Sequence, residues 1–246
     1  MNVLIDIGNT RLKWLIEHDD QFGPLMAVDY RQQDFLTALH QAWQAIDIPK
    51  TIAIASVSNK QILKSIQQLS LSLWSQAQLL IPQSTAAAFG VKIAYAQPEK
   101  LGIDRWLALI AAHHHYAGNL CIVDCGTAIT VDGLQANGSH VGGLICPGLR
   151  LMKQALAGNT ADLDFSNQPF AVQLETKTEA AIANGVFMAA IGMIEQVMQK
   201  LDSNYQLVIT GGDAEILAKG LSRPTIVDHG LVMKGLSLFC QGEPVP

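Results

Sequence analysis

The chain has 246 residues, of which 49% are hydrophobic and 15% charged, and its formal net charge is -5. It is long and apolar enough to bury one or two hydrophobic cores, which excludes a disordered chain. Nucleic acids and anionic membranes attract clustered Lys and Arg, so the acidic balance favours neither partner. Polar residues interrupt each apolar run before the roughly 18 residues of a membrane span. We therefore expect a soluble, cytoplasmic protein.

The N-terminal segment and the cysteines agree with that expectation. The opening residues MNVLIDIGNT lack the basic region of a signal peptide and predict a buried strand instead. The four cysteines form no CxxC pair and have no zinc-ligand spacing; they are Cys121, Cys125, Cys146 and Cys240. We expect reduced thiols with a structural role.

The first part of the chain has the pattern of an α/β structure. Residues 3–7 predict a buried strand, and after a polar turn at residues 8–10 an alternating segment predicts its hairpin partner at 11–17. Helical spacing and β-branched runs then predict a helix at 34–46, a strand at 51–57, a helix at 61–69 and a strand at 79–81.

The pattern continues to the C-terminus. A helix is predicted at 104–116, with Asp104 in the first turn, where helices favour acidic residues. Strands are then expected within 119–134, from 140 and at 206–210, and helices at 149–157, 178–201, within 211–221 and at 231–239.

One pattern occurs twice in the sequence. It consists of a strand, an Asp, a Gly, a Thr and a second strand, and it is found at Asp6 and again at Asp124, 118 positions later. A repeat on this scale indicates two related half-domains. We expect the halves to comprise residues 1–117 and 118–246. No low-complexity linker separates them, so they are expected to pack across a central cleft.

The two Asp-Gly-Thr turns have the residue types of a phosphate site. Glycine lets the backbone approach a phosphate closely, and Asn and Thr add hydrogen-bond donors. A carboxylate repels a phosphate directly, so its natural partner is a bound cation that bridges the two. Lys13 can add positive charge. The alternative is an ordinary Asx-type hairpin turn, which the repetition of the motif disfavours.

Other nucleotide motifs are weak or absent. The turn Thr210-Gly211-Gly212-Asp213 lies between a predicted strand and a predicted helix, where backbone N–H groups suit an anion, although glycine often serves simply to turn the chain there. The sequence contains no GxxxxGK[ST] loop and no GxGxxG fingerprint. A bound nucleotide would therefore need a different kind of site.

The segment Leu101-Gly102-Ile103-Asp104-Arg105-Trp106 combines a carboxylate and a guanidinium at a helix start. Asp104 could accept a hydroxyl proton, and Arg105 could clamp an anionic group. The local alternative is an acid that offsets the helix dipole beside an exposed Arg. His113, His114 and His115 are consecutive and cannot face one metal together, so we expect a partly solvated helix end there.

Six motifs in order, DIGNTRLK, PEKLGIDRW, VDCGTAITVD, GGLICPGL, TKTEAAIANG and ITGGD, resemble the type III pantothenate kinases over essentially the whole chain. The resemblance implies an α/β fold of two duplicated actin-like (ribonuclease H-like) half-domains, the fold of the acetate and sugar kinase, Hsp70 and actin superfamily. It also implies ATP-dependent phosphorylation of pantothenate to 4'-phosphopantothenate, the first step of coenzyme A biosynthesis.

Site roles follow from the resemblance, position by position. The ATP-binding residues would be Asp6, Gly8, Asn9, Thr10, Lys13, Gly126 and Thr127. Asp124 would bind a monovalent cation, K⁺ or NH₄⁺, and Asp6 would act through Mg²⁺. Asp104 would be the catalytic base. The pantothenate-binding residues would be Tyr95, Gly102, Ile103, Asp104, Arg105 and Thr178.

Two positions depart from the family pattern. Ile103 stands where a smaller residue such as Ala is common, and Thr176 offers a competing register for Thr178, which we prefer because its step to Gly185 fits the family. The resemblance further implies a homodimer, which the apolar segment 186–193 would suit. The rival interpretations are a sugar, polyol or carboxylate kinase of the same superfamily and a relative without catalytic activity.

Overall fold

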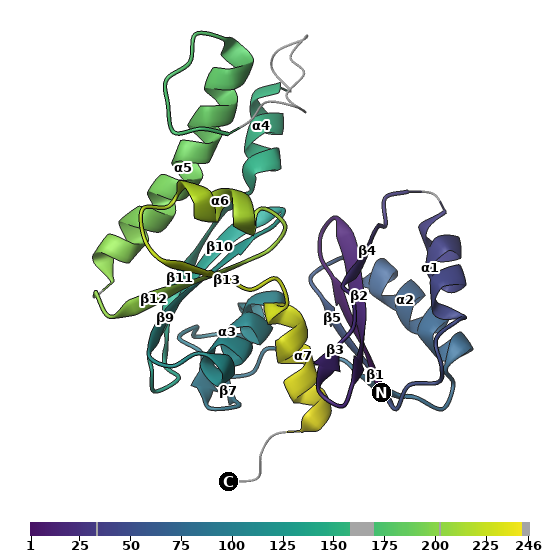
Figure 1. Cartoon of the computed structure of the whole chain (residues 1–246). Coiled ribbons are helices and arrows are strands. Elements are labelled where there is room, and N and C mark those ends of the chain that lie inside the picture. Colours follow the sequence, from purple (N-terminus) through teal and green to yellow (C-terminus); the bar gives the residue numbers. More distant parts are fainter. Residues whose placement is uncertain (33, 158–169, 202, 243–246) are drawn as a thin grey trace. The chain divides into compact units, whose positions relative to one another are not determined.

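The computed structural model describes residues 1–32, 34–157, 170–201 and 203–242. It divides into two compact units, shown in Figure 1. The first comprises Met1–Gly90, Tyr95–Ala111 and Gly230–Pro246, and the second comprises Val91–Ala94 and Ala112–His229. The C-terminal segment thus belongs to the first unit, although the sequence order placed it with the second half. The boundary at residues 117 and 118, and the central cleft, stay predictions.

The first unit is built on a twisted sheet with the strand order β3-β2-β1-β5-β6, in which β4 also pairs with β2. Its strands are β1 (Asn2–Ile7), β2 (Arg11–His18), β3 (Gln21–Phe22), β4 (Met26–Asp29), β5 (Thr51–Ser56) and β6 (Gln78–Leu80). Strands β1 and β2 are antiparallel, whereas β1, β5 and β6 run parallel. The helices are α1 (Phe35–Trp43), α2 (Lys60–Leu73), α7 (Leu231–Gln241) and α3 (Ile103–His115) up to Ala111, with the short 3-10 helix η1 (Pro98–Lys100).

Alternation along β1 divides its side chains between two faces. Val3, Ile5 and Ile7 belong to the core that includes the buried side chains of α1 and α2. Successive side chains of a strand point to opposite faces, so Leu4 and Asp6 point to the other face. Helix α7 contacts both β1 and β5. Because α1 and α2 occupy the first face, α7 covers the face to which Asp6 belongs.

The second unit repeats this plan with the strand order β11-β10-β9-β12-β13. Its elements are β9 (Asn119–Cys125), β10 (Ala128–Leu134), β11 (His140–Pro147), α4 (Leu149–Ala157), α5 (Thr178–Lys200), β12 (Tyr205–Thr210), α6 (Ala214–Gly220) and β13 (Thr225–Val227). A two-stranded ribbon, β7 (Ala87–Ala88) with β8 (Val91–Lys92), precedes η1. Cys121, Val123 and Cys125 of β9 pack into the core beneath α5 and α6, which leaves Asp124 on the opposite face.

The sheets confirm the duplication expected from the repeat. In each unit the strand that carries the Asp pairs antiparallel with the next strand and parallel with a later one: β1 with β2 and β5, β9 with β10 and β12. Each Asp lies near the carboxyl end of its strand, on the face opposite the apolar cluster that includes α1 and α2 in the first unit and α5 and α6 in the second. The two motifs are therefore structurally equivalent.

Helix α5 has the length and the mean hydropathy, 1.5, of a membrane-spanning helix. The sequence analysis considered only uninterrupted apolar runs and did not predict this. It contributes a buried stripe to the second unit's core, including Phe187, Ile191 and Ile194. A core helix meets the same two criteria, and 44% of the apolar window is buried in this unit.

Candidate functional site

The turn between β1 and β2 forms the first half of the candidate site. The N–H of Gly8 donates to the carbonyl of Arg11 at 3.0 Å, which closes the turn. Asn9 is exposed at its tip and Thr10 is partly exposed. Asp6 is only 9% exposed and lies directly opposite Lys13 in the strand register, so both side chains are on the same face of the sheet.

The start of α3 lies beside the same end of this sheet. The N–H of Val57, which follows β5, donates to the carbonyl of Ile7 at 3.0 Å. A Cβ built on Gly102 would lie 3.8 Å from Cγ1 of Val57. The carboxyl ends of parallel strands are where α/β proteins place their sites. The structure thus brings the Gly102 segment and the first turn to one edge of the first unit.

Asp104 is held at the helix start as the sequence predicted. It lies in the first turn of α3, and its Oδ1 accepts the backbone N–H of Arg105 at 2.7 Å. A Cβ on Gly102 would lie 2.5 Å from that same oxygen. Glycine is therefore required at position 102 if the carboxylate is to keep this orientation.

The side chain of Arg105 contacts Tyr95 in two ways. Its Nη1 donates to the Tyr95 hydroxyl at 3.0 Å, and the guanidinium carbon lies 5.6 Å from the centre of the Tyr95 ring. Arg105 is only 5% exposed, so the alternative of a solvent-exposed Arg beside a helix-start acid is wrong. Buried arginines occur where an anion or a polar network satisfies them. Tyr95 and Arg105 therefore form one cluster.

The turn between β9 and β10 forms the equivalent feature of the second unit. The N–H of Gly126 donates to the carbonyl of Ala128 at 3.0 Å, the counterpart of the Gly8 bond. Asp124 lies opposite Thr130 on one side and Thr210 on the other. Thr127 is positioned through its carbonyl, which accepts the N–H of Gly148 at 2.9 Å.

The glycine turn after β12 lies against Asp124. Gly211 has a φ of +95°, and a Cβ there would lie 2.5 Å from Oδ1 of Asp124. The N–H of Asp213 donates to the carbonyl of Cys125 at 3.0 Å. The Thr210–Asp213 segment therefore does more than turn the chain, because glycine at 211 lets the backbone lie close against the Asp124 carboxylate and the Cys125 carbonyl.

The Cys125 thiol lies close to two carboxylates at the second turn. Burial, and then the neighbouring Asp124 and Asp213, raise the pKa of Cys125 well above its usual range, so this thiol stays neutral. Among the residues that the structure describes, no group of three or more His, Cys, Asp or Glu side chains could hold a metal ion.

Two of the predicted substrate contacts are the first residues of helices. Ile103 is the first residue of α3 and is nearly buried at 9% exposure. Thr178 is the first residue of α5 and Thr176 lies in the preceding loop, both exposed. The preference for Thr178 stays a prediction. The histidines at the end of α3 are partly buried at 113 and exposed at 114 and 115, which confirms the expected solvated helix end.

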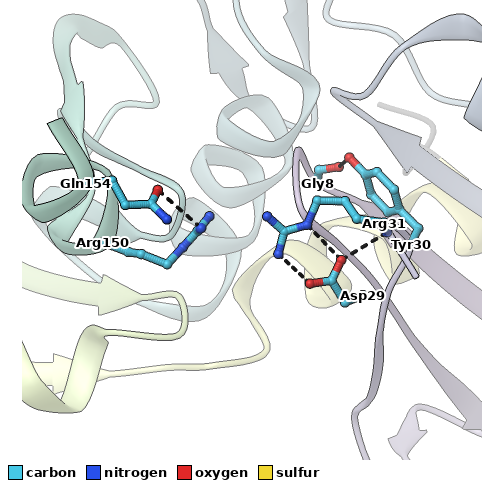
Figure 2. A network of polar contacts seen from close by, with 6 residues as sticks. All are labelled: Gly8, Asp29, Tyr30, Arg31, Arg150 and Gln154. Carbon is cyan, nitrogen blue, oxygen red and sulfur yellow. Dashed lines mark hydrogen bonds and ion pairs between the residues drawn. The ribbon is translucent and has the colours of Figure 1, made fainter. Parts of the chain in front are cut away.

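The sequence did not reveal a set of residues that surrounds the first turn. The hydroxyl of Tyr30 donates to the carbonyl of Gly8 at 2.7 Å, and Asp29 holds the side chain of Arg31 (Figure 2). These residues come from the end of β4, a strand of four residues that was not predicted. A Tyr and an Arg near a short polar segment carry no recognisable motif, so only the strand pairing reveals them.

Comparison with known proteins identifies the family. The model of the family described as type III pantothenate kinase matches residues 2–200. A type III pantothenate kinase from Nitrosococcus oceani is 36% identical, with 96% of this chain and 92% of that protein covered. Another, from Halorhodospira halophila, is 38% identical, with 94% and 96% covered. This chain belongs to the type III pantothenate kinase family. The family and the kinase class expected from the sequence are confirmed.

Solved structures confirm the actin-like fold of this family member. The activator of 2-hydroxyisocaproyl-CoA dehydratase from Clostridium difficile, solved with bound ADPNP, superposes with a TM-score of 0.56 at 12% identity, covering 98% of this chain and 94% of that chain. MreB 5 of Spiroplasma citri, solved with AMPPNP, gives 0.54 at 7% identity, with 98% and 96% covered. At such low identity these likenesses support the fold alone.

Proposed function

We propose that this chain transfers the terminal phosphoryl group of ATP to the primary hydroxyl of pantothenate and so makes 4'-phosphopantothenate, the first step of coenzyme A biosynthesis. The observation that carries the proposal is the cluster of Asp104, Arg105 and Tyr95 at the start of α3, in a chain that belongs to the pantothenate kinase family. A carboxylate beside a buried guanidinium suits a substrate with a hydroxyl at one end and a carboxylate at the other.

The two Asp-Gly turns bind the phosphates of ATP in this proposal. The first turn offers Gly8, Asn9 and Thr10, with Lys13 opposite Asp6, and the second offers Gly126 and Thr127. Asp6 would hold Mg²⁺ and Asp124 would hold K⁺ or NH₄⁺. When bound, such cations neutralise phosphate charge that the carboxylates would otherwise repel. Thr130 and Thr210 lie directly opposite Asp124 in the strand register, and the oxygen atoms of these side chains support the assignment of a cation to Asp124.

Asp104 orients the pantothenate hydroxyl and receives its proton. The hydroxyl oxygen forms a bond to the terminal phosphorus, the bond from that phosphorus to the bridging oxygen breaks, and ADP leaves. Phosphoryl transfer needs little covalent help from a protein, so positioning and charge neutralisation supply most of the acceleration. The 2.7 Å bond from the Arg105 N–H fixes the orientation of the Asp104 carboxylate. Arg105 and Tyr95 bind the carboxylate end of the substrate.

A homodimer completes the proposal. The exposed side of α5 contains Gly185, Met188 and Gly192 and opposes the buried stripe of that helix. Small and apolar residues on one helix face allow close packing against a second copy. Thr178, at the start of the same helix, is proposed as a further substrate contact. A monomeric mass in solution at full activity would contradict the dimer.

One experiment tests the reaction and the base together. ADP release is coupled to a spectroscopic signal, with and without pantothenate, in Na⁺ and then in K⁺ buffer. We expect release only with pantothenate and faster release in K⁺. Asp104→Asn should lower kcat by about 10²- to 10⁴-fold and leave ATP affinity nearly unchanged. Turnover close to the wild type would rule out Asp104 as the base, and a panel of sugars and polyols would reveal a different acceptor.

A further inference from the structure

The end of β4 lies against the first phosphate turn. Arg11 and Asp29 are direct partners in the register of β2 and β4, and the carbonyl of Arg11 is the group that closes the turn by accepting the N–H of Gly8. Tyr30, the next residue along, donates its hydroxyl to the Gly8 carbonyl at 2.7 Å (Figure 2). The turn is thus held by β2 through its backbone and by β4 through a side chain.

Arg31 is held in a fixed orientation at the same place. Its Nε donates to Oδ1 of Asp29 at 2.9 Å and its Nη2 donates to Oδ2, so the guanidinium and the carboxylate meet as two planar forks. The backbone N–H of Arg31 also donates to Oδ1 at 3.0 Å. The side chain is nevertheless 54% exposed. A guanidinium has five N–H groups, and only two of them donate to Asp29.

An exposed ion pair contributes little to folding stability, so stability alone does not explain the two-pronged contact between Arg31 and Asp29. The hydrogen bonds from Arg31 hold the pKa of Asp29 well below its usual range, and the carboxylate stays ionised. Burial raises the pKa of Tyr30, so its hydroxyl keeps the proton that it donates to Gly8. Both contacts therefore persist over the pH range in which a cytoplasmic enzyme works.

We propose that Arg31 binds the phosphate chain of ATP and that Tyr30 is a positioning residue for the turn that receives it. The inference rests on the proposed function of that turn. A carbonyl oxygen directed at a phosphate would repel it, whereas N–H groups attract it. The Tyr30 hydroxyl engages the Gly8 carbonyl and fixes its direction. Arg31, already oriented by Asp29, loses little side-chain freedom when it binds an anion.

The test compares ATP with AMP. Arg31→Gln should weaken ATP binding, measured by calorimetry, by about 10-fold, since a charge-assisted hydrogen bond is lost. AMP affinity and the KM for pantothenate should change less than about 2-fold, since AMP lacks the β- and γ-phosphates.

Tyr30→Phe should raise the KM for ATP severalfold at an unchanged KM for pantothenate. Arg31→Lys, which keeps the charge without the planar fork, should lie between Arg31→Gln and the wild type.

Lys64→Gln provides the matched control, because it removes one positive charge from an exposed position on α2 of the same unit. It should leave both nucleotide affinities unchanged. An Arg31→Gln protein that binds ATP as tightly as the wild type would overturn the inference, and so would an equal loss for ATP and AMP, which would indicate a general structural effect. A wild-type protein that binds ATP but releases no ADP with pantothenate would refute only the proposed reaction, because the binding comparison stands without it.

Discussion

Replacing Gly102 by Ala should disable Asp104 without unfolding the protein. The new Cβ would lie 2.5 Å from Oδ1 of Asp104, whereas ordinary contact begins near 3.4 Å. The flexible carboxylate can withdraw by about 1 Å, at the expense of its bond from the Arg105 N–H. A misplacement of about 1 Å in a reacting group costs about 10²-fold in rate. We therefore expect kcat to fall by about 10²-fold, with a small change in the thermal midpoint.

The assay is pantothenate-dependent ADP release, with ATP affinity measured separately by calorimetry. The control is a double variant. If Gly102→Ala acts only through the carboxylate, then adding it to Asp104→Asn should cost little further rate, since two changes that act through one group are not additive. Full activity in Gly102→Ala would refute the reasoning, and so would a double variant whose losses multiply.

Three further outcomes test the substrate cluster, the second turn and the buried thiols. Tyr95→Phe removes the hydroxyl that accepts from Arg105, and steady-state kinetics should show a severalfold higher KM for pantothenate at a similar kcat. Gly211 and Gly142 both have a positive φ, +95° and +114°, but only position 211 lacks space for a Cβ. Gly211→Ala should therefore lower the thermal midpoint more than Gly142→Ala. Equal shifts would contradict this. Burial raises the pKa of Cys121 from 9.0 to about 12, so the unfolded chain releases this proton first and stability falls as the pH rises above 9. Cys121→Ala should flatten that fall, and an unchanged slope would show that other groups cause it.

Much of this fold could be predicted from the sequence, because its signals are local. The apolar run before Asp6, the Gly that follows it and the alternating partner strand identify a hairpin without tertiary information. The second copy at Asp124 then fixes the duplicated architecture. Asp104 was correctly placed in the first turn of a helix, since acidic residues at a helix start are favoured by the dipole.

The parts that could not be predicted depend on contacts between distant segments. The short strand β4 becomes a strand only by pairing with β2, so the approach of Tyr30 to Gly8 has no local signature. Helix α7 packs on β1, more than 200 residues earlier in the chain, and on β5, more than 170 residues earlier. Its Ser237 hydroxyl donates to Glu17 of β2, a carboxylate that is 2% exposed. Hydrophobic periodicity predicts that α7 is a helix, but does not indicate which sheet it covers.

The two equivalent turns differ in their neighbours, and the difference suits the two roles proposed for them. Asp6 has Lys13 directly across the strand pair, and the supporting side chains nearby include Arg31. Asp124 has the neutral Thr130 and Thr210 instead. A carboxylate beside cations leaves less negative charge to repel a phosphate, whereas a carboxylate among hydroxyl groups attracts a cation more strongly. The neighbouring strands therefore support the proposed phosphate at the first turn and the proposed monovalent cation at the second.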